Sequence, residues 1–363
     1  MKTHFPTSWQ DKLQQLHFTD FTQIQEEAFE PINSGKNFLG ISPTGTGKTL
    51  AYLWPSLLTL QAKKAQQLLI LAPNSELAGQ LFDVTKTWAE PLGLTAQLFL
   101  SGSSQKRQIE RLKKGPEILI GTPGRVFELV RLKKIKMMAV NTIVLDEFDE
   151  LLNDSQYQFV EGIVKRVPRD HQMIYMSATN KLSTADLAAD TLTVDLSDQT
   201  LDSISHYYIT VDKRERVELL RKFSNIPDFR ALVFFNSLSD LGASEERLQY
   251  SHASAVSLAS DINVKFRKVI LEKFKEYELA LLLATDLVAR GIDIDDLEYV
   301  INFDLARDKE AYTHRAGRTG RMGKTGAVIT FVSHKEELKK LKKFANVSEI
   351  TLKNQILQPK SNR

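Results

Sequence analysis

The sequence contains no cysteine, which excludes a disulfide framework and any zinc site built on thiolates. It also lacks a run of about 18 apolar residues that could cross a membrane as a helix. Its N-terminal segment, MKTHFPTSWQDKLQQL, has polar and charged residues where a signal peptide needs an apolar core. We therefore expect a cytoplasmic protein that is neither secreted nor membrane-spanning.

The chain has little excess charge of either sign. Its 48 basic and 45 acidic side chains leave a net charge of +3, which is too small to indicate a nucleic-acid binder. One stretch, residues 106–136, is clearly basic, because its lysines and arginines far outnumber Glu110, Glu117 and Glu128. Charge alone favours solvated helix faces for this stretch.

Apolar runs rich in β-branched residues alternate with segments of helical periodicity, which is typical of parallel sheets covered by helices on both faces. The expected strands are 37–41, 67–71, 96–100, 117–120, 142–145, 172–176, 205–211, 231–235, 255–258, 279–284, 299–303 and 327–332. A polar segment near 195–203 separates two sets of them. We predict two α/β lobes, residues 1–198 and 204–350, a linker at 199–203 and a short frayed tail at 351–363.

The sharpest local motif is SPTGTGKT at residues 42–49, between an expected strand and the apolar helix expected at 50–60. Its glycines let backbone N–H groups point at phosphate oxygens, Lys48 can neutralise the β- and γ-phosphates, and the Thr49 hydroxyl can ligate magnesium. The strict pattern has glycine where Ser42 stands. The predicted phosphate-binding residues are Thr44, Gly45, Thr46, Gly47, Lys48 and Thr49.

Acidic residues follow the expected strand 142–145. Asp146 suits a magnesium shell, and Glu147 can orient and deprotonate an attacking water. A solvated acidic strand end is the simpler alternative. The phosphate-binding loop in the same lobe favours catalysis.

In the second lobe, HRAGRTGR at residues 314–321 spaces Arg315, Arg318 and Arg321 three apart, which places them near one face if the segment is helical. Arginines that reach a γ-phosphate from another lobe stabilise the charge of the transition state.

Together these motifs resemble those of the DEAD-box RNA helicases of superfamily 2, with a DEFD variant of the motif that names the family. The resemblance runs through most of the chain, and the motifs follow the family order. The matching segments are 17–25 (Q motif), 42–49 (I), 73–78 (Ia), 101–102 (glycine pair), 122–125 (Ib), 146–149 (the DEAD motif), 177–179 (III), 233–237 (IV), 285–293 (V) and 314–321 (VI).

The resemblance implies two RecA-like lobes that bind ATP, Mg²⁺ and single-stranded RNA or a short duplex across a cleft, with low sequence specificity. It implies an RNA-stimulated ATPase that separates short duplexes or remodels RNA–protein complexes. No membrane and no particular protein partner are implied.

The same resemblance assigns roles to individual residues. Catalysis falls to Lys48, Asp146, Glu147, Arg318 and Arg321, and the metal to Thr49 and Asp146. Nucleotide binding adds Gln25, Gly291 and Asp293 to the phosphate loop. The implied RNA contacts are Pro73, Asn74, Gly102, Thr122, Pro123, Gly124, Arg125, Thr285 and Asp286. Coupling between the lobes is assigned to Asp149, Ser177, Thr179 and His314.

Several positions depart from the family pattern. Phe148 replaces an alanine, and we expect its ring to pack behind the carboxylates. Ser75 replaces an arginine of motif Ia, Phe21 replaces a proline of the Q motif, and Ala259 with Ser260 stands where the family has His-Gly.

These departures bear on two rival functions. The serine at position 75 keeps open an ATP-dependent RNA clamp or assembly factor with weak unwinding. A DNA-directed helicase of the wider superfamily is opposed by Gln25 together with motifs Ib and VI.

The aromatic residue that packs on adenine upstream of the Q motif has no clear counterpart. Phe5 and Trp9 are candidates, although either could simply pack on the lobe. We expect Trp9, Trp54 and Trp88, which all lie on helical stretches, to pack in the core rather than to stack on bases.

Overall fold

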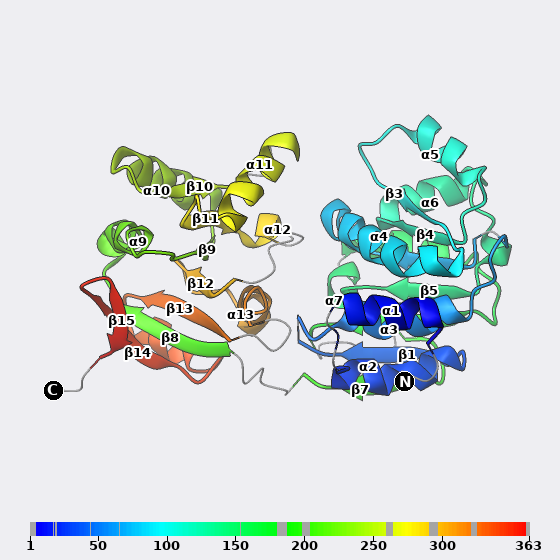
Figure 1. Ribbon diagram of the computed structural model, residues 1–363, viewed down its shortest axis with the longest axis horizontal. Coiled ribbons are helices and arrows are strands. Elements are labelled where there is room, and N and C mark those ends of the chain that lie inside the picture. The colour runs from blue at the N-terminus through cyan, green and yellow to red at the C-terminus, as the bar shows by residue number, and fades with distance from the viewer. Residues whose placement is uncertain are drawn as a thin grey trace. The chain divides into compact units, whose positions relative to one another are not determined.

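The computed structural model divides into two compact units, Met1–Gln199 and Thr200–Arg363, and the division falls inside the predicted linker 199–203 (Figure 1). Each unit has its own sheet and its own hydrophobic layers, so each is described by itself. The residues that the structure describes are 5–16, 18, 20–43, 45–64, 66–152, 154–179, 187–197, 204–258, 264–289, 297–320 and 325–360.

The first unit is built on a seven-stranded parallel sheet with the order β3-β4-β2-β5-β6-β1-β7. Its strands are β1 (Phe38–Ile41), β2 (Leu68–Leu71), β3 (Ala96–Phe99), β4 (Ile118–Gly121), β5 (Thr142–Leu145), β6 (Gln172–Ser177) and β7 (Leu192–Asp195). Every residue of the five central strands is buried, because helices cover both faces.

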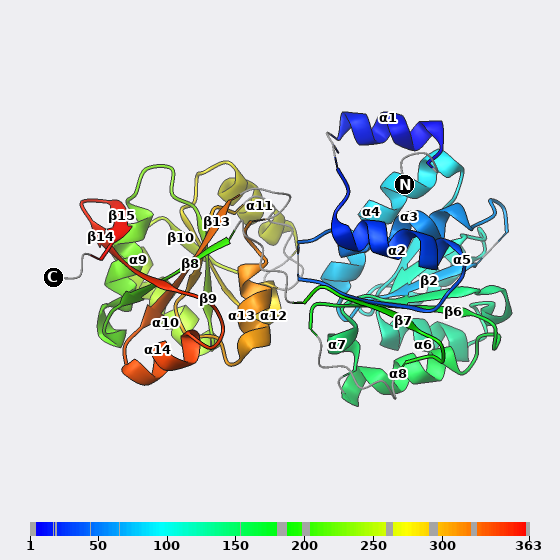
Figure 2. The ribbon, with the colours of Figure 1, turned by 90° about the horizontal axis from the view of Figure 1, so that it is seen from below.

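One face of this sheet is covered by the first four helices and the other by α6, α7 and α8 (Figure 2). The helices are α1 (Thr7–Gln15), α2 (Gln23–Asn33), α3 (Lys48–Leu58), α4 (Ser75–Ala89), α5 (Gln105–Leu112), α6 (Pro123–Arg131), α7 (Phe148–Leu151) and α8 (Asp154–Val164), with short 3-10 turns at Glu90–Leu92 and Met137–Ala139. Among the described residues, no helix is long and apolar enough to cross a membrane.

The three tryptophans form the centre of one apolar layer, as expected. The rings of Trp54 and Trp88 lie 5.2 Å apart, and the Trp9 indole N–H donates to the Trp88 carbonyl at 2.8 Å. Phe5 packs edge-on against Trp9 at 5.2 Å, and both side chains are buried. Phe5 and Trp9 therefore pack on the lobe, so neither is available in this structure to stack on adenine.

The second unit has an eight-stranded sheet with the order β10-β11-β9-β12-β13-β8-β14-β15, parallel except for the β14–β15 pair. Its strands are β8 (Ile204–Thr210), β9 (Ala231–Phe235), β10 (Ala255–Ser257), β11 (Leu281–Thr285), β12 (Tyr299–Asn302), β13 (Gly326–Val332), β14 (Ser348–Lys353) and β15 (Ile356–Pro359).

Helices again cover both faces of this second sheet. The helices are α9 (Arg216–Ser224), α10 (Leu238–Tyr250), α11 (Val264–Lys275), α12 (Asp286–Ala289), α13 (Lys309–Ala316) and α14 (Lys335–Leu341), with a 3-10 turn at Lys213–Glu215. The first two pack in one apolar layer and the other four in the second. The prediction of mostly parallel α/β sheets is confirmed in both units.

Two segments differ from the sequence prediction. Strand β7 was not expected; it lies at the sheet edge, is mostly exposed and so lacks the apolar run of a buried strand. The frayed tail predicted from residue 351 was wrong, because β14 runs to Lys353 and pairs antiparallel with β15. Between them Asn354 and Gln355 both have positive φ, at 49° and 62°, as in a two-residue hairpin turn that usually carries glycine.

One buried carboxylate, that of Glu117, connects three segments of the first unit by hydrogen bonds. Glu117 accepts from the backbone N–H of Lys63 at 2.7 Å, and from the N–H and the hydroxyl of Thr95 at 2.8 and 2.7 Å. Burial raises the pKa of Glu117, but these hydrogen bonds outweigh burial and hold the pKa below its usual value. The charged form therefore stabilises the fold.

We predict that Glu117→Gln lowers the free energy of unfolding by roughly 1–3 kcal/mol at pH 7, because one carboxylate oxygen becomes a donor that faces other donors. The pKa is depressed in the folded state, so the loss should shrink as pH falls below the unfolded value near 4.5. Urea unfolding at several pH values measures this, with exposed Glu110→Gln as the control. An equal stability of both variants at pH 7 would contradict the assignment.

Candidate functional site

The phosphate-binding segment forms the turn between β1 and α3. Gly45 and Gly47 have φ of 88° and 89°, in the left-handed region that favours glycine. A Cβ on Gly47 would lie 2.3 Å from the Gln25 side-chain nitrogen, so this position also needs glycine for space. The loop leads directly into the N-terminus of α3, where free backbone N–H groups favour an anion. Thr44 lies outside the described residues.

Polar side chains of the loop fold onto its own backbone. The Lys48 ammonium donates to the Ser42 carbonyl at 2.7 Å, and the Thr46 hydroxyl donates to the Pro43 carbonyl at 2.8 Å. The Ser42 and Thr46 hydroxyls also lie 2.7 Å apart. Ser42, which replaces the usual glycine, thus helps to hold the loop, and Lys48 is kept beside it as a largely buried cation.

The buried amide of Gln25 joins α2 to this loop. Its oxygen accepts from the Thr22 backbone N–H at 3.0 Å, as part of a capping box, and its nitrogen donates to the Gly47 carbonyl at 3.3 Å. The side chain is only 3% exposed. Gln25 therefore contacts the phosphate loop, and any adenine contact would be made by a group already held in place.

Two adjacent carboxylates follow β5, whose neighbours are β2 and β6. Asp146 is 3% exposed; one carboxylate oxygen accepts from the Glu147 N–H at 3.0 Å and the other from the Tyr52 hydroxyl at 3.0 Å. Burial, followed by the charge of Glu147, raises the pKa of Asp146 to about 7, and Lys48 opposes this rise. Glu147 itself has a left-handed backbone with φ of 50°, which is unusual outside glycine.

The residues assigned to lobe coupling in this unit contact one another. The Thr179 hydroxyl donates to a carboxylate oxygen of Asp149 at 2.9 Å, and the Ser177 hydroxyl donates to the Thr179 carbonyl at 2.8 Å. These contacts connect the end of β6 to α7, the helix that begins beside Glu147. The Phe148 ring is buried and packs on Tyr175 with ring centres 4.7 Å apart.

The residues expected to contact RNA in the first unit lie at helix starts and in turns. Asn74 caps α4, since its side-chain oxygen accepts from the Leu77 N–H at 2.9 Å, and Pro73 precedes it. Thr122 is the cap residue of α6, followed by Pro123 and Gly124. All of them remain predicted RNA contacts.

Arg125 is more buried than a free RNA ligand would be. Its guanidinium pairs with Glu128 at 3.2 Å and donates to the Ser103 carbonyl at 3.3 Å, next to Gly102, whose φ is 81°. Arg125 therefore fixes the glycine-pair loop in this structure. Its contact with RNA stays a prediction.

Arg315 is the centre of the motifs in the second unit. It is 1% exposed and pairs with both carboxylate oxygens of Asp286 at 2.6 and 2.7 Å. It also donates to the side-chain oxygens of Asn236 at 2.7 Å and Asn302 at 3.2 Å. Arg315 thus connects motifs IV, V and VI. Asp286, which directly follows Thr285 and was predicted to contact RNA, forms its ion pair with Arg315 inside the unit.

The condition for placing three arginines on one helical face is not met, because the helix does not extend to Arg318. Helix α13 ends at Ala316, so Arg318 lies beyond the helix while Arg315 and the buried His314 lie within it. Gly317 is the C-cap residue of this helix, with φ of −65°. Arg321, Gly291 and Asp293 lie outside the described residues.

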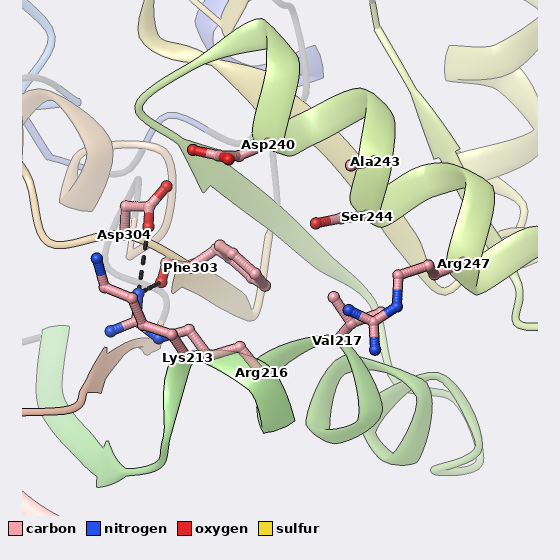
Figure 3. A pocket seen from close by; sticks show the side chains of 9 residues that line it. All are labelled: Lys213, Arg216, Val217, Asp240, Ala243, Ser244, Arg247, Phe303 and Asp304. Carbon is pink, nitrogen blue, oxygen red and sulfur yellow. Dashed lines mark hydrogen bonds and ion pairs between the residues drawn. The ribbon is translucent and has the colours of Figure 1, made fainter.

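A separate cavity of about 230 Å³ in the second unit is lined by α9, α10 and the end of β12 (Figure 3). Its buried cation is Arg216, which donates to the Phe303 carbonyl at 2.6 Å and to carboxylate oxygens of Asp304 and Glu337 at 3.2 and 3.3 Å. Because these carboxylates neutralise the guanidinium, Arg216 stabilises the packing of α9 and is not an exposed anion ligand.

The sequence did not reveal Tyr52 as a member of these clusters, and it did not reveal the buried role of Arg315. Tyr52 carries no motif signal, although its position four residues after Lys48 places it on the same face of α3. Arg315 was identified only as one of three spaced arginines, and its burial could not be foreseen from that spacing.

Two family models match the chain: DEAD/DEAH box helicase over residues 22–187 and the helicase conserved C-terminal domain over residues 215–323. The probable ATP-dependent RNA helicase YfmL of Bacillus subtilis is 41% identical over 331 residues, which cover 89% of this chain and 88% of the relative. The DEAD-box ATP-dependent RNA helicase CshC of Bacillus cereus is 36% identical over 335 residues, 90% of this chain and 86% of the relative.

The fold matches solved structures as well. Saccharomyces cerevisiae Dbp5 bound to RNA and ADP BeF3 superposes with a TM-score of 0.82 at 24% identity, over 95% of this chain and 93% of that one. This likeness identifies the two sheets as RecA-like lobes. With its motifs, its fold and its relatives in agreement, the chain belongs to the DEAD-box family of ATP-dependent RNA helicases.

Proposed function

We infer that this protein hydrolyses ATP when RNA binds and uses the cycle to separate short duplexes or remodel RNA–protein complexes. The observation that carries this proposal is the placement of the Lys48 cation near the buried carboxylate of Asp146, which is followed by Glu147, at the phosphate-binding turn of the first unit. The relatives named as RNA helicases favour RNA over DNA as the partner, and unwinding over a clamp with weak unwinding.

The residues of the turn suit a nucleoside triphosphate. Two kinds of donor would bind the phosphates, the backbone N–H groups at the start of α3 and the Lys48 ammonium. A phosphate oxygen would then replace the Ser42 carbonyl as the acceptor of the Lys48 hydrogen bond. Gln25, held by the capping box, would offer its amide to adenine. Since its nitrogen already contacts Gly47, base recognition would be coupled directly to the loop.

Glu147 is the proposed catalytic base. A positioned carboxylate can orient a water against the γ-phosphate and accept its proton. The left-handed backbone at Glu147 sets the direction in which this side chain leaves the strand end. Strain of this kind costs about 1–3 kcal/mol and persists only where the surrounding structure holds it in place.

Asp146 and Thr49 fit a magnesium ion. Asp146 is a buried carboxylate whose pKa is raised first by burial and then by the charge of Glu147, and a divalent cation would stabilise its charged form. Hard oxygen ligands of this kind suit Mg²⁺. When bound, the ion would neutralise charge that develops on the β- and γ-phosphate oxygens.

The second unit would supply Arg318 and Arg321 to the transferring phosphate, together with Gly291 and Asp293 at the nucleotide. RNA can favour such a two-unit arrangement only if it binds that arrangement more tightly than the others. Thr285 and the residues of motif Ib are proposed for those contacts. Of the proposed coupling residues, Asp149 lies two positions after Glu147, Thr179 donates to Asp149, and Ser177 donates to the Thr179 carbonyl.

We predict that Glu147→Gln leaves ATP affinity within a few fold but reduces RNA-stimulated hydrolysis by roughly 10²–10⁴-fold, because the amide cannot accept the proton of the water. Phosphate release in the presence of RNA measures the rate, and a fluorescent ATP analogue measures binding. Exposed Glu90→Gln is the control. A rate for Glu147→Gln near that of the wild type would remove Glu147 from the role of base.

We also predict that Asp146→Asn stabilises the nucleotide-free protein by roughly 0.5–2 kcal/mol at pH 8, although it abolishes most hydrolysis. The pKa of Asp146 is raised to about 7 in the folded state from an unfolded value of 3.8, so the wild type loses stability as pH rises between these two values and the loss stays constant above them. The gain should therefore shrink at pH 5.5. Thermal unfolding at both pH values, with exposed Asp170→Asn as the control, tests this; a pH-independent effect would contradict the cause given.

A further inference from the structure

One buried hydroxyl contacts a residue proposed to hold magnesium, and it comes from the helix that carries the other. The Tyr52 hydroxyl donates to the Asp146 carboxylate at 3.0 Å, and Tyr52 follows Thr49 by three residues on α3. Tyr52 lies beyond the phosphate-binding motif, which ends at Thr49, and none of the helicase motifs includes it.

The helix places this hydroxyl accurately. Tyr52 follows Lys48 by four residues and Thr49 by three, so the three side chains share one face of α3. The Tyr52 ring is fully buried in the apolar layer that also contains Trp54. A ring packed in this way has little freedom, so its hydroxyl is fixed by the core of the unit.

Both oxygens of Asp146 are therefore held. Tyr52 donates to one of them, and the Glu147 backbone N–H donates to the other at 3.0 Å. Rotation of the carboxylate about its last bond would break both hydrogen bonds. The orientation of Asp146 in the nucleotide-free protein is set by these two donors, and only one of them is a side chain.

We propose that Tyr52 is a positioning residue for the magnesium site, which fixes the Asp146 carboxylate before nucleotide and metal arrive. This inference rests on the proposed function, since it assumes that Asp146 holds the ion. Partners that orient metal ligands in this way typically change metal affinity by about 10–100-fold when they are removed.

A purely structural role for Tyr52 makes a different prediction. If the hydroxyl only satisfied a buried carboxylate, its removal would lower the thermal stability and leave the response to magnesium unchanged. A positioning role changes the magnesium dependence of nucleotide binding while nucleotide affinity without metal stays the same. The two roles are separated by the metal response rather than by activity.

The test is Tyr52→Phe in the full chain, which removes the hydroxyl and keeps the ring. Binding of a fluorescent ATP analogue is measured in EDTA and across a magnesium titration, with thermal unfolding alongside. We expect affinity in EDTA to stay within about twofold and the half-maximal magnesium concentration to rise about 10–100-fold. The control is Tyr175→Phe, which removes another buried hydroxyl, one that accepts from the Ala188 N–H at 3.0 Å.

A wild-type magnesium response in folded Tyr52→Phe overturns the proposal, and so does an equal shift in Tyr175→Phe. A different result would count against the proposed function instead: a wild-type protein whose nucleotide binding does not respond to magnesium at all. Should Tyr52→Phe unfold, the magnesium titration is repeated in a stabilising osmolyte such as sucrose, which favours the compact state because it is excluded from the protein surface. A wild-type magnesium response of the variant under those conditions would then overturn the proposal.

Discussion

The first unit depends on a pair of carboxylates placed where the central sheet ends, in surroundings that cannot fully solvate them. Burying Asp146 beside Glu147 costs free energy, and Lys48 compensates only part of that cost. The surrounding elements all help to hold this arrangement. The carboxylates directly follow β5, Lys48 and Tyr52 lie on α3, and Gly47 leaves space for the Gln25 side chain. A site with unbalanced buried charge is suited to a charged ligand that completes it.

In the second unit, by contrast, the buried charge of Arg315 is fully compensated by its neighbours. Arg315 is paired with both oxygens of Asp286 and also donates to Asn236 and Asn302, so its cation is compensated within the unit. This network fixes motifs IV, V and VI relative to one another. We infer that the two units have different roles. The first contains a nucleotide site whose charge is not balanced without ligand, and the second contains motifs that are rigidly connected to one another.

The central strands and the phosphate loop could be predicted because buried parallel strands are continuous apolar runs and because TGTGKT between a strand and a helix is a specific phosphate-binding pattern. Strand β7 and the β14–β15 hairpin could not, because one is an exposed edge and the other turns through Asn354 and Gln355 rather than glycine. Tyr52 acts through its contact with Asp146, and Arg315 through its contact with Asp286. Both partners are distant in sequence, so residue spacing alone does not predict these contacts.

RNA binding brings the proposed nucleotide site to catalytic competence. This is tested by the steady-state rate of ATP hydrolysis by the intact protein with magnesium, alone, with single-stranded RNA, and with DNA of the same sequence. We expect a slow basal rate, a large stimulation by RNA, and little by DNA, because contacts to the 2′-hydroxyl distinguish the two nucleic acids. Hydrolysis that is equally fast without nucleic acid, or equally stimulated by DNA, would contradict it.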